Sequence, residues 1–251
     1  MTSGEPYLLR GGDVSCLLLH GFTATPHAMR WMGEFLAERG LTVLGVRLHG
    51  HASDRQDLRR SRWKDWMSSL EDGWNILNGF SKRIYLIGHS TGGSLALLAS
   101  TILPTAGVVA MSVPIELPSL PKLLKPLLWP MSVFKPYLKK GDGKWHEPSI
   151  GAQYITYPAY PVRTIIELDR LLTRLNQVIP EIETPVMLVH SKKDDFIPFT
   201  QMQKLYRMLQ TKDKQTFVIK ESRHIITMDI ERELVFQAVY DFIQRLEKEQ
   251  S

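Results

Sequence analysis

The sequence predicts an α/β fold in which a mainly parallel central sheet is covered by helices on both faces. Segments with a strand pattern alternate with segments whose apolar residues recur at helical spacing along most of the chain. Several strand segments are apolar throughout, which is typical of parallel strands buried on both faces. A length of 251 residues suits one large domain, and we expect a single domain over residues 1–251.

The first elements follow from hydrophobic patterning and from glycine positions. Residues 14–22 form a largely apolar run that predicts the first strand. Residues 26–39 carry methionine, phenylalanine and leucine at helical spacing before Gly40, which predicts a helix and its end. A second strand is expected over residues 41–48 and a second helix over residues 63–77.

The middle and the end of the chain repeat this pattern. A third strand over residues 83–87 leads at once into a helix over residues 94–103, and another strand is expected over residues 107–113. The remaining expected elements are strands over residues 185–190 and 216–219, a helix near residues 200–209, and a closing helix over residues 231–248 with one apolar stripe.

The alternation stops between about residues 114 and 160. Prolines interrupt a leucine-rich stretch, at Pro118, Pro121, Pro126, Pro130, Pro136, Pro148 and Pro158. A linker would not carry this much apolar surface, so we expect a cap or lid inserted into the domain. Regular structure is expected to resume at Pro161 as the first residue of a helix.

Composition excludes several classes of protein. Hydrophobic residues make up 43% and charged residues 23% of the chain, which argues against disordered, collagenous and disulfide-rich proteins. The single cysteine, Cys16, excludes an intrachain disulfide and is expected in the core. We expect no signal peptide, and no apolar run approaches the roughly 18–20 residues of a membrane span, so a cytoplasmic protein is expected.

The net charge of +5 raises the question of an acidic partner. Residues 118–145 contain one acid, Asp142, and six lysines, namely Lys122, Lys125, Lys135, Lys139, Lys140 and Lys144. This local excess equals the whole net charge, which argues against a nucleic-acid partner. We favour solvated lysines on a cap over an apolar acyl pocket; the alternative is a cap that contacts an anionic lipid or micelle interface.

Residues 88–92 read Gly-His-Ser-Thr-Gly between an expected strand and an expected helix. In this context G-x-S-x-G predicts a nucleophile elbow, in which Ser90 occupies a sharp turn that exposes its Oγ above the sheet. A phosphate-binding loop is excluded because Ser94 stands where its lysine would be, and G-x-G-x-x-G is absent.

A serine nucleophile needs a histidine base that is oriented by an acid, and in this arrangement both follow the serine in the chain. His224 lies in a loop after the last expected strand, at the edge of the sheet where ligands bind. We therefore expect His224 to be the base. His146 belongs to the irregular insertion, and His190 ends a buried strand, where a hydrogen-bonded core role is expected.

Two adjacent carboxylates, Asp194 and Asp195, compete for the role of the acid. The spacing to Pro198, which follows Asp194 by four residues, favours Asp194 as the acid but does not exclude Asp195. Whichever aspartate is not used is expected to pair with Lys192 or Lys193.

Residues 20–23, His-Gly-Phe-Thr, directly follow the first strand. Backbone N–H groups of such a loop can point at the same oxygen as the N–H of the residue after the nucleophile. Phe22 and Thr91 are thus the expected oxyanion-hole donors, and His20 is expected to hold the loop.

A metal site is the alternative for His49, His51, Asp54 and Asp57. A metallohydrolase H-x-H-x-D-H pattern would require aspartate at position 53 and histidine at position 54, where serine and aspartate stand instead. We interpret this segment as a loop and expect no metal or other cofactor.

Together these motifs resemble α/β-hydrolases of the bacterial carboxylesterase and monoacylglycerol lipase branch. The matching segments span nearly the whole chain: residues 20–27, 47–51, 63–66, 88–93, 194–198 and 222–229. The resemblance implies an α/β-hydrolase fold with a cap, Asp194 rather than Asp195 as the acid, and Phe22 and Thr91 as oxyanion donors. Ala52 departs from the glycine frequent there in the family, and residues 114–160 match poorly.

The sequence therefore predicts a serine hydrolase that cleaves carboxylic esters with short or medium acyl chains, with monoacylglycerols among the candidates. The expected catalytic residues are Ser90, Asp194 and His224, the expected partner is a small ester with an apolar acyl chain, and the expected assembly is a monomer or homodimer. The alternatives are a thioesterase or acyltransferase that uses the same residues and, less favoured, a non-catalytic ligand-binding member of the fold.

Overall fold

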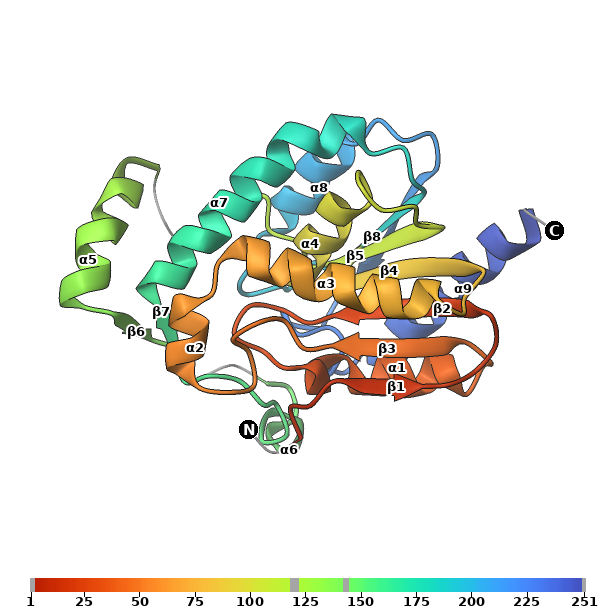
Figure 1. Cartoon of the computed structure of the whole chain (residues 1–251), viewed down its shortest axis with the longest axis horizontal. Coiled ribbons are helices and arrows are strands. Elements are labelled where there is room, and N and C mark those ends of the chain that lie inside the picture. The colour runs from red at the N-terminus through yellow and green to blue at the C-terminus, as the bar shows by residue number, and fades with distance from the viewer. Residues whose placement is uncertain (1–2, 118–121, 142–144, 250–251) are drawn as a thin grey trace.

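The computed structural model describes residues 3–117, 122–141 and 145–249, with no side-chain description for residues 122–124 (Figure 1). Its centre is a seven-stranded sheet in the order β1-β3-β2-β4-β5-β8-β9, in which only the β1–β3 pair is antiparallel. The strands are β1 (Tyr7–Leu9), β2 (Val14–Leu19), β3 (Thr42–Val46), β4 (Arg83–His89), β5 (Gly107–Met111), β8 (Val186–Ser191) and β9 (Lys214–Ile219). The predicted mainly parallel sheet is confirmed.

Helices cover both faces of this sheet. One layer contains α3 (Trp63–Asn78), α4 (Thr91–Ala99), α7 (Val162–Val178) and α8 (Phe199–Met208), and the other contains α1 (Arg30–Ala37) and α9 (Arg232–Glu249) (Figure 1). Alternate side chains of β2 enter opposite cores: Leu17 and Leu19 face the larger layer, and Cys16 and Leu18 face α1 and α9. Cys16 is fully buried, as predicted.

Several boundaries differ from the sequence prediction. Strand β1 was not predicted, because its three edge residues, two half-buried and one exposed, leave no long apolar pattern. The helix expected over residues 26–39 divides into the 3₁₀-helix η1 (Pro26–Met29) and α1. Pro161 is the N-cap of α7 rather than its first residue, because it ends a short strand.

The segment between β5 and α7 contains short elements rather than one regular layer. They are η2 (Lys122–Leu127), α5 (Leu128–Phe134), β6 (Tyr137–Lys139), α6 (Pro148–Gly151) and β7 (Ala159–Pro161), of which β6 and β7 form an antiparallel pair. Helix α5 packs on α7 (Figure 1). It leaves large apolar side chains exposed around it, namely Leu127, Trp129, Val133 and Phe134.

The lysines of this segment have different environments. Lys135 and Lys139 are exposed, as expected. Lys125 forms an ion pair with Asp169 of α7 at 2.5 Å. Lys140 is half-buried and its Nζ donates to Thr23 and Thr156, so the prediction of a solvated side chain is wrong for this residue. The prolines at 118 and 121, together with Asp142 and Lys144, lie outside the described residues, as does the side chain of Lys122.

The remaining elements are α2 (Arg55–Arg60), which also packs on α7, and the short 3₁₀-helix η3 (Ile179–Glu181). None of the helices in the described part of the chain combines the length and hydrophobicity that a transmembrane span requires.

Candidate active site

Ser90 occupies a tight turn between the end of β4 and the start of α4. Its φ of 53° and ψ of −119° lie outside the regions that non-glycine residues favour, which is a strained conformation typical of functional turns. A Cβ at Gly88 would overlap the backbone of Gly92, and a Cβ at Gly92 would overlap the carbonyl of Leu19. The two glycines therefore allow the turn to form, and the predicted strand–turn–helix context is confirmed.

A line of hydrogen bonds joins three of the predicted side chains. His224 Nε2 lies 3.2 Å from Ser90 Oγ, and His224 Nδ1 lies 2.9 and 3.1 Å from the two carboxylate oxygens of Asp194. Since an ionised carboxylate only accepts hydrogen bonds, the ring proton lies on Nδ1 and Nε2 is free to accept the Ser90 hydroxyl. The structure therefore brings Ser90, His224 and Asp194 together in the order that a general base requires.

The carboxyl group of Asp194 is completely buried. Burial alone would raise its pKa, but the adjacent His224 and the amide of Ile197 hold the pKa below its usual value. One carboxylate oxygen accepts the backbone N–H groups of Phe196 and Ile197 at 2.9 and 2.7 Å. Asp194 is thus held ionised and in a fixed orientation behind the imidazole.

Asp195 lies outside this hydrogen-bonded line. It is exposed and contacts Arg223 at 3.4 Å, whereas Lys193 pairs with Glu221 at 2.5 Å. The expected pairing of the unused aspartate with Lys192 or Lys193 is therefore wrong. The chain turns between positions 194 and 195, so the two neighbouring carboxylates face different surroundings.

The segments that carry the expected oxyanion donors lie against each other. An ideal Cβ on Gly21 would come 3.3 Å from the Cβ of Ser90, which places the Phe22 loop beside the elbow. Thr91 is the first residue of α4, and the first amides of a helix have no partner within the helix. His20 Nδ1 donates to the Gly21 carbonyl and Nε2 accepts the Leu48 amide, so His20 holds this loop as expected.

Comparison with known proteins places the chain in a family. The family model described as serine aminopeptidase, S33, matches residues 13–231. The chain belongs to this α/β-hydrolase family. A carboxylesterase of Bacillus subtilis (strain 168) is 31% identical over 248 residues, which cover 98% of this chain and 99% of the relative. A thermostable monoacylglycerol lipase of Bacillus sp. (strain H-257) is 25% identical over 246 residues, which cover 98% of this chain and 96% of the relative.

Solved structures agree on the fold. A metagenome-derived lipolytic enzyme superposes with a TM-score of 0.89 at 23% identity, covering 98% of this chain and 99% of the other. A monoacylglycerol lipase of Paleococcus ferrophilus gives a TM-score of 0.80 at 19% identity, covering 96% and 98%. With these relatives the chain is a hydrolase of the α/β-hydrolase fold.

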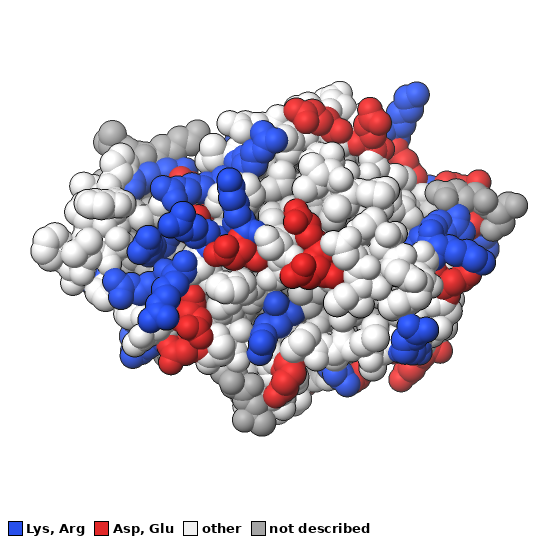
Figure 2. Space-filling model, in the orientation of Figure 1, with Lys and Arg blue, Asp and Glu red and all other residues white. Residues whose placement is uncertain are grey.

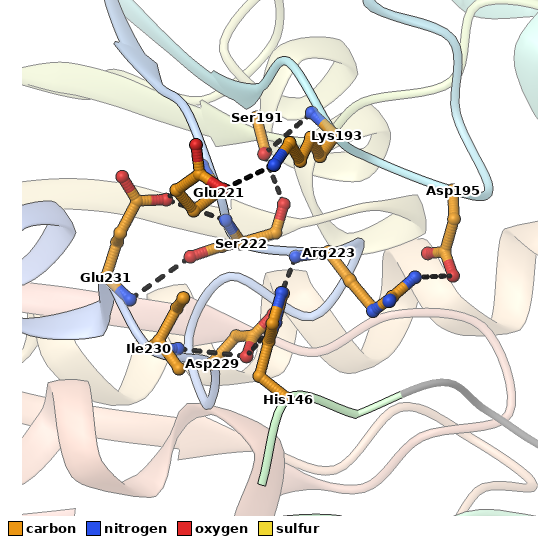
Figure 3. A network of polar contacts seen from close by, with 10 residues as sticks. All are labelled: His146, Ser191, Lys193, Asp195, Glu221, Ser222, Arg223, Asp229, Ile230 and Glu231. Carbon is orange, nitrogen blue, oxygen red and sulfur yellow. Dashed lines mark hydrogen bonds and ion pairs between the residues drawn. The ribbon is translucent and has the colours of Figure 1, made fainter.

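In this α/β-hydrolase, a network of carboxylates holds the loop that carries His224 (Figure 3). The carboxylate of Glu231 accepts the amides of Lys220, Glu221 and Ser222 at 3.1, 2.8 and 2.7 Å. Asp229 accepts the amide of Arg223 at 2.6 Å. These bonds satisfy the successive backbone donors that lead to the base.

Other histidines support the same loop. His89 Nε2 donates to the His224 carbonyl at 2.8 Å, and burial, with the neighbouring His224 ring as the second cause, lowers the pKa of His89 to about 3. His146 Nδ1 lies 3.0 Å from both oxygens of Asp229, which links the segment before α6 to this network (Figure 3). His190 is buried and bonded to the Ile197 carbonyl at 2.9 Å, as expected for a core histidine.

Sequence reasoning missed Asp229 and Glu231 as supports of the His224 loop. Asp229 was noted only within the family resemblance. The sequence did offer a signal for this support. Both carboxylates follow His224 by only a few residues, in a segment without a strand pattern, where they can accept backbone N–H groups of the same loop.

The residues considered for a metal site make separate contacts in the hydrolase. His49 Nδ1 lies 3.0 Å from Ser61 Oγ, the buried ring of His51 packs edge-on against His20, and Asp54 caps α2 by accepting the Gln56 amide at 2.6 Å. Within residues 3–117, 122–141 and 145–249, no group of three His, Cys, Asp or Glu side chains is placed to hold a metal ion.

Proposed function

We propose that this hydrolase cleaves carboxylic esters with short or medium acyl chains, monoacylglycerols among them, through an acyl-enzyme on Ser90. The observation that carries the proposal is the hydrogen-bonded line from Asp194 through His224 to Ser90 at a strained turn. The names of the carboxylesterase and lipase relatives support esters as the substrate class.

In the proposed reaction, Ser90 Oγ attacks the ester carbonyl while His224 Nε2 accepts the hydroxyl proton. The buried carboxylate of Asp194 orients the ring and stabilises the imidazolium that forms. The amides of Phe22 and Thr91 donate to the oxyanion of the tetrahedral intermediate. His224 then protonates the departing alcohol, and a water molecule activated by the same histidine releases the acid and regenerates the serine.

Labelling with a fluorophosphonate probe tests this proposal. The wild-type protein should be labelled and should hydrolyse p-nitrophenyl esters, whereas Ser90→Ala should do neither, because the alanine has no oxygen to phosphonylate. A series of esters from acetate to laurate should show maximal kcat/KM at a short or medium chain. Ser100→Ala serves as the matched control, since Ser100 is the C-cap of α4 and its hydroxyl donates to the Leu97 carbonyl at 2.8 Å, at the opposite end of the helix from Ser90.

Equal labelling of the wild type and Ser90→Ala would contradict the proposed nucleophile. Faster turnover of acyl-CoA than of oxygen esters of equal chain length would favour a thioesterase that uses the same residues.

We propose that residues 114–160 form a cap whose outer surface contacts an anionic lipid or micelle interface. Trp129 and Phe134 on α5 are 71% and 88% exposed, which is unusual for large apolar side chains. Figure 2 shows Lys and Arg side chains gathered at the same end of the molecule, near α2 and α7. Apolar side chains beside basic ones suit an interface with anionic lipid.

Binding to vesicles tests the lipid interface. The double variant Trp129→Gln/Phe134→Gln should bind phosphatidylglycerol vesicles at least about tenfold more weakly than wild type, because the exposed apolar groups no longer enter the lipid. Its turnover of a soluble short-chain ester should stay within twofold. Ile102→Gln is the matched control, because Ile102 is 61% exposed but follows α4 in a different part of the fold.

Unchanged vesicle affinity of the double variant would contradict this contact. Equal binding of the wild type to phosphatidylcholine and phosphatidylglycerol vesicles would show that the basic side chains do not contribute to lipid binding.

A further inference from the structure

We propose that Lys140 and Thr23 are positioning residues for the oxyanion loop, so that the segment between β5 and α7 completes the hydrolytic site. This inference rests on the proposed function of Ser90 and Phe22. Lys140 directly follows β6, and Thr23 directly follows the expected oxyanion donor Phe22. The two residues are 117 positions apart in the chain and meet through their side chains.

Thr23 has a backbone conformation that needs support. Its φ of 62° lies in the left-handed region, which is unfavourable for a β-branched residue, and its side chain is fully buried. Such conformations are unfavourable and persist where surrounding contacts over-determine them. Glycine would adopt this φ without strain, whereas threonine occupies the position at a conformational cost.

The contacts that hold Thr23 come mainly from the inserted segment. The Thr23 carbonyl accepts the Tyr157 amide at 3.1 Å and the Thr156 hydroxyl at 3.0 Å. The Thr23 hydroxyl donates to the Phe22 carbonyl at 2.5 Å and accepts a hydrogen bond from Lys140 Nζ. Both backbone and side chain of Thr23 are therefore bonded, and the Thr23 hydroxyl links Lys140 to the carbonyl of Phe22.

The Nζ of Lys140 contacts three residues around the oxyanion loop: Thr23, Thr156 and Tyr160. Its Nζ donates to Thr23 and, at 2.6 Å, to the Thr156 hydroxyl, and it lies 4.8 Å from the centre of the Tyr160 ring. The same Tyr160 ring stacks on the Phe22 ring, with centroids 5.8 Å apart and planes 2° apart. Lys140 and Tyr160 thus restrain the main chain and the side chain of Phe22 together.

The surroundings of Lys140 disfavour its charged form, although the residue is only half-buried. Burial lowers the pKa of Lys140 to about 7, and the partners described for its Nζ are neutral hydroxyls and an aromatic ring. Of the titratable groups nearby, buried His51 has a pKa well below its usual value, chiefly through burial, so it adds no second positive charge beside Lys140. A neutral amine keeps two N–H donors, so both hydroxyl contacts remain possible on either side of this pKa. Groups with displaced pKa values concentrate at functional sites.

These contacts indicate how Lys140 acts on the oxyanion donor. An oxyanion donor is effective only when its N–H already points at the developing charge, and displacements of about 1 Å cost up to about 100-fold in rate. Lys140 reaches the Phe22 carbonyl only through the Thr23 hydroxyl, and this carbonyl lies on the same residue as the expected donor N–H. Lys140 is therefore a positioning residue for the donor.

Lys140→Met removes the two hydrogen bonds while keeping an unbranched side chain of similar length. We expect kcat for a soluble ester to fall at least about fivefold, with KM within twofold, because the contact acts on the transition state. The rate of fluorophosphonate labelling should fall in parallel. The melting temperature should equal or exceed that of wild type, because methionine has no amine to desolvate at this half-buried position. Lys139→Met is the matched control, since Lys139 is the exposed neighbour.

Substitutions of Thr23 separate the hydroxyl contact from the backbone conformation. Thr23→Ser keeps the hydroxyl and should retain kcat within twofold. Thr23→Gly relieves the strain at φ 62° but removes the hydroxyl, and kcat should fall at least about fivefold although the protein remains folded. A purely conformational role of Thr23 would give the reverse order of activities.

The inference is overturned if Lys140→Met retains kcat within twofold, if Thr23→Gly is as active as Thr23→Ser, or if the losses are confined to KM. Measuring Ser90→Ala in the same series separates the two proposals. Wild-type labelling and activity in Ser90→Ala would show that the proposed function has failed. An inactive Ser90→Ala beside a fully active Lys140→Met would show that only the positioning role has failed.

Discussion

Replacing Asp194 by asparagine is expected to lower kcat for ester hydrolysis by roughly 10³–10⁴-fold, while the protein stays folded. The carboxylate now accepts the Nδ1 proton of His224 at 2.9 Å and so leaves Nε2 free for Ser90. An asparagine that presents its NH₂ group to Nδ1 favours the opposite tautomer, in which Nε2 carries the proton and cannot act as the base. Steady-state kinetics with a p-nitrophenyl ester measure the loss, and circular dichroism checks the fold.

Asp195→Asn is the matched control, because it makes the same chemical change one residue later. Its side chain is exposed and only 3.4 Å from Arg223 at the surface, where such pairs contribute about 0–1 kcal/mol. We expect kcat within twofold of wild type. Equal losses in the two variants, or a larger loss in Asp195→Asn, would show that the acid has been assigned to the wrong carboxylate.

Replacing Gly92 by alanine is expected to lower the free energy of unfolding by about 3 kcal/mol and to abolish most of the activity. The added Cβ would overlap the carbonyl of Leu19 and lie 2.7 Å from the carbonyl oxygen of His20. These are main-chain atoms of β2 and of the oxyanion loop, which no side-chain rotation can move aside. Relief would require a shift of the elbow against the strand, and that shift would displace Ser90.

Gly141→Ala controls for the loss of a glycine as such, since a Cβ at Gly141 would lie more than 4 Å from every described residue other than its chain neighbours. Its unfolding free energy should stay within about 0.5 kcal/mol of wild type. Urea unfolding measures both variants. A stability change below about 1 kcal/mol in Gly92→Ala would mean that the elbow does not pack against β2 as described.

The central sheet and the elbow could be predicted because their signals are local. An apolar run of β2 or β4 reads as a buried strand whatever surrounds it, and the glycines at 88 and 92 report a tight turn within five residues. Short elements at the edge, such as β1, escaped prediction because three residues carry too little pattern.

The choice between Asp194 and Asp195 could not be made from local sequence signals alone. Both residues have the same chemistry and adjacent positions, so spacing could only favour one of them. The structure distinguishes them because the chain turns between the two, burying one carboxylate against His224 and leaving the other beside Arg223. Likewise, the six lysines of the insertion look alike in the sequence, and only packing distinguishes half-buried Lys140, bonded to Thr23, from exposed Lys139.

The sequence by itself determined the fold class, the turn at Ser90 and the residue types available for catalysis, because these depend on backbone preferences and on hydrophobic periodicity among near neighbours. The tertiary structure alone decided which side chains meet: Ser90 and His224 lie 134 positions apart, and Lys140 and Thr23 lie 117 apart. Hydrogen bonds act over about 3 Å, so partners this distant in the chain become defined only when strands and helices pack.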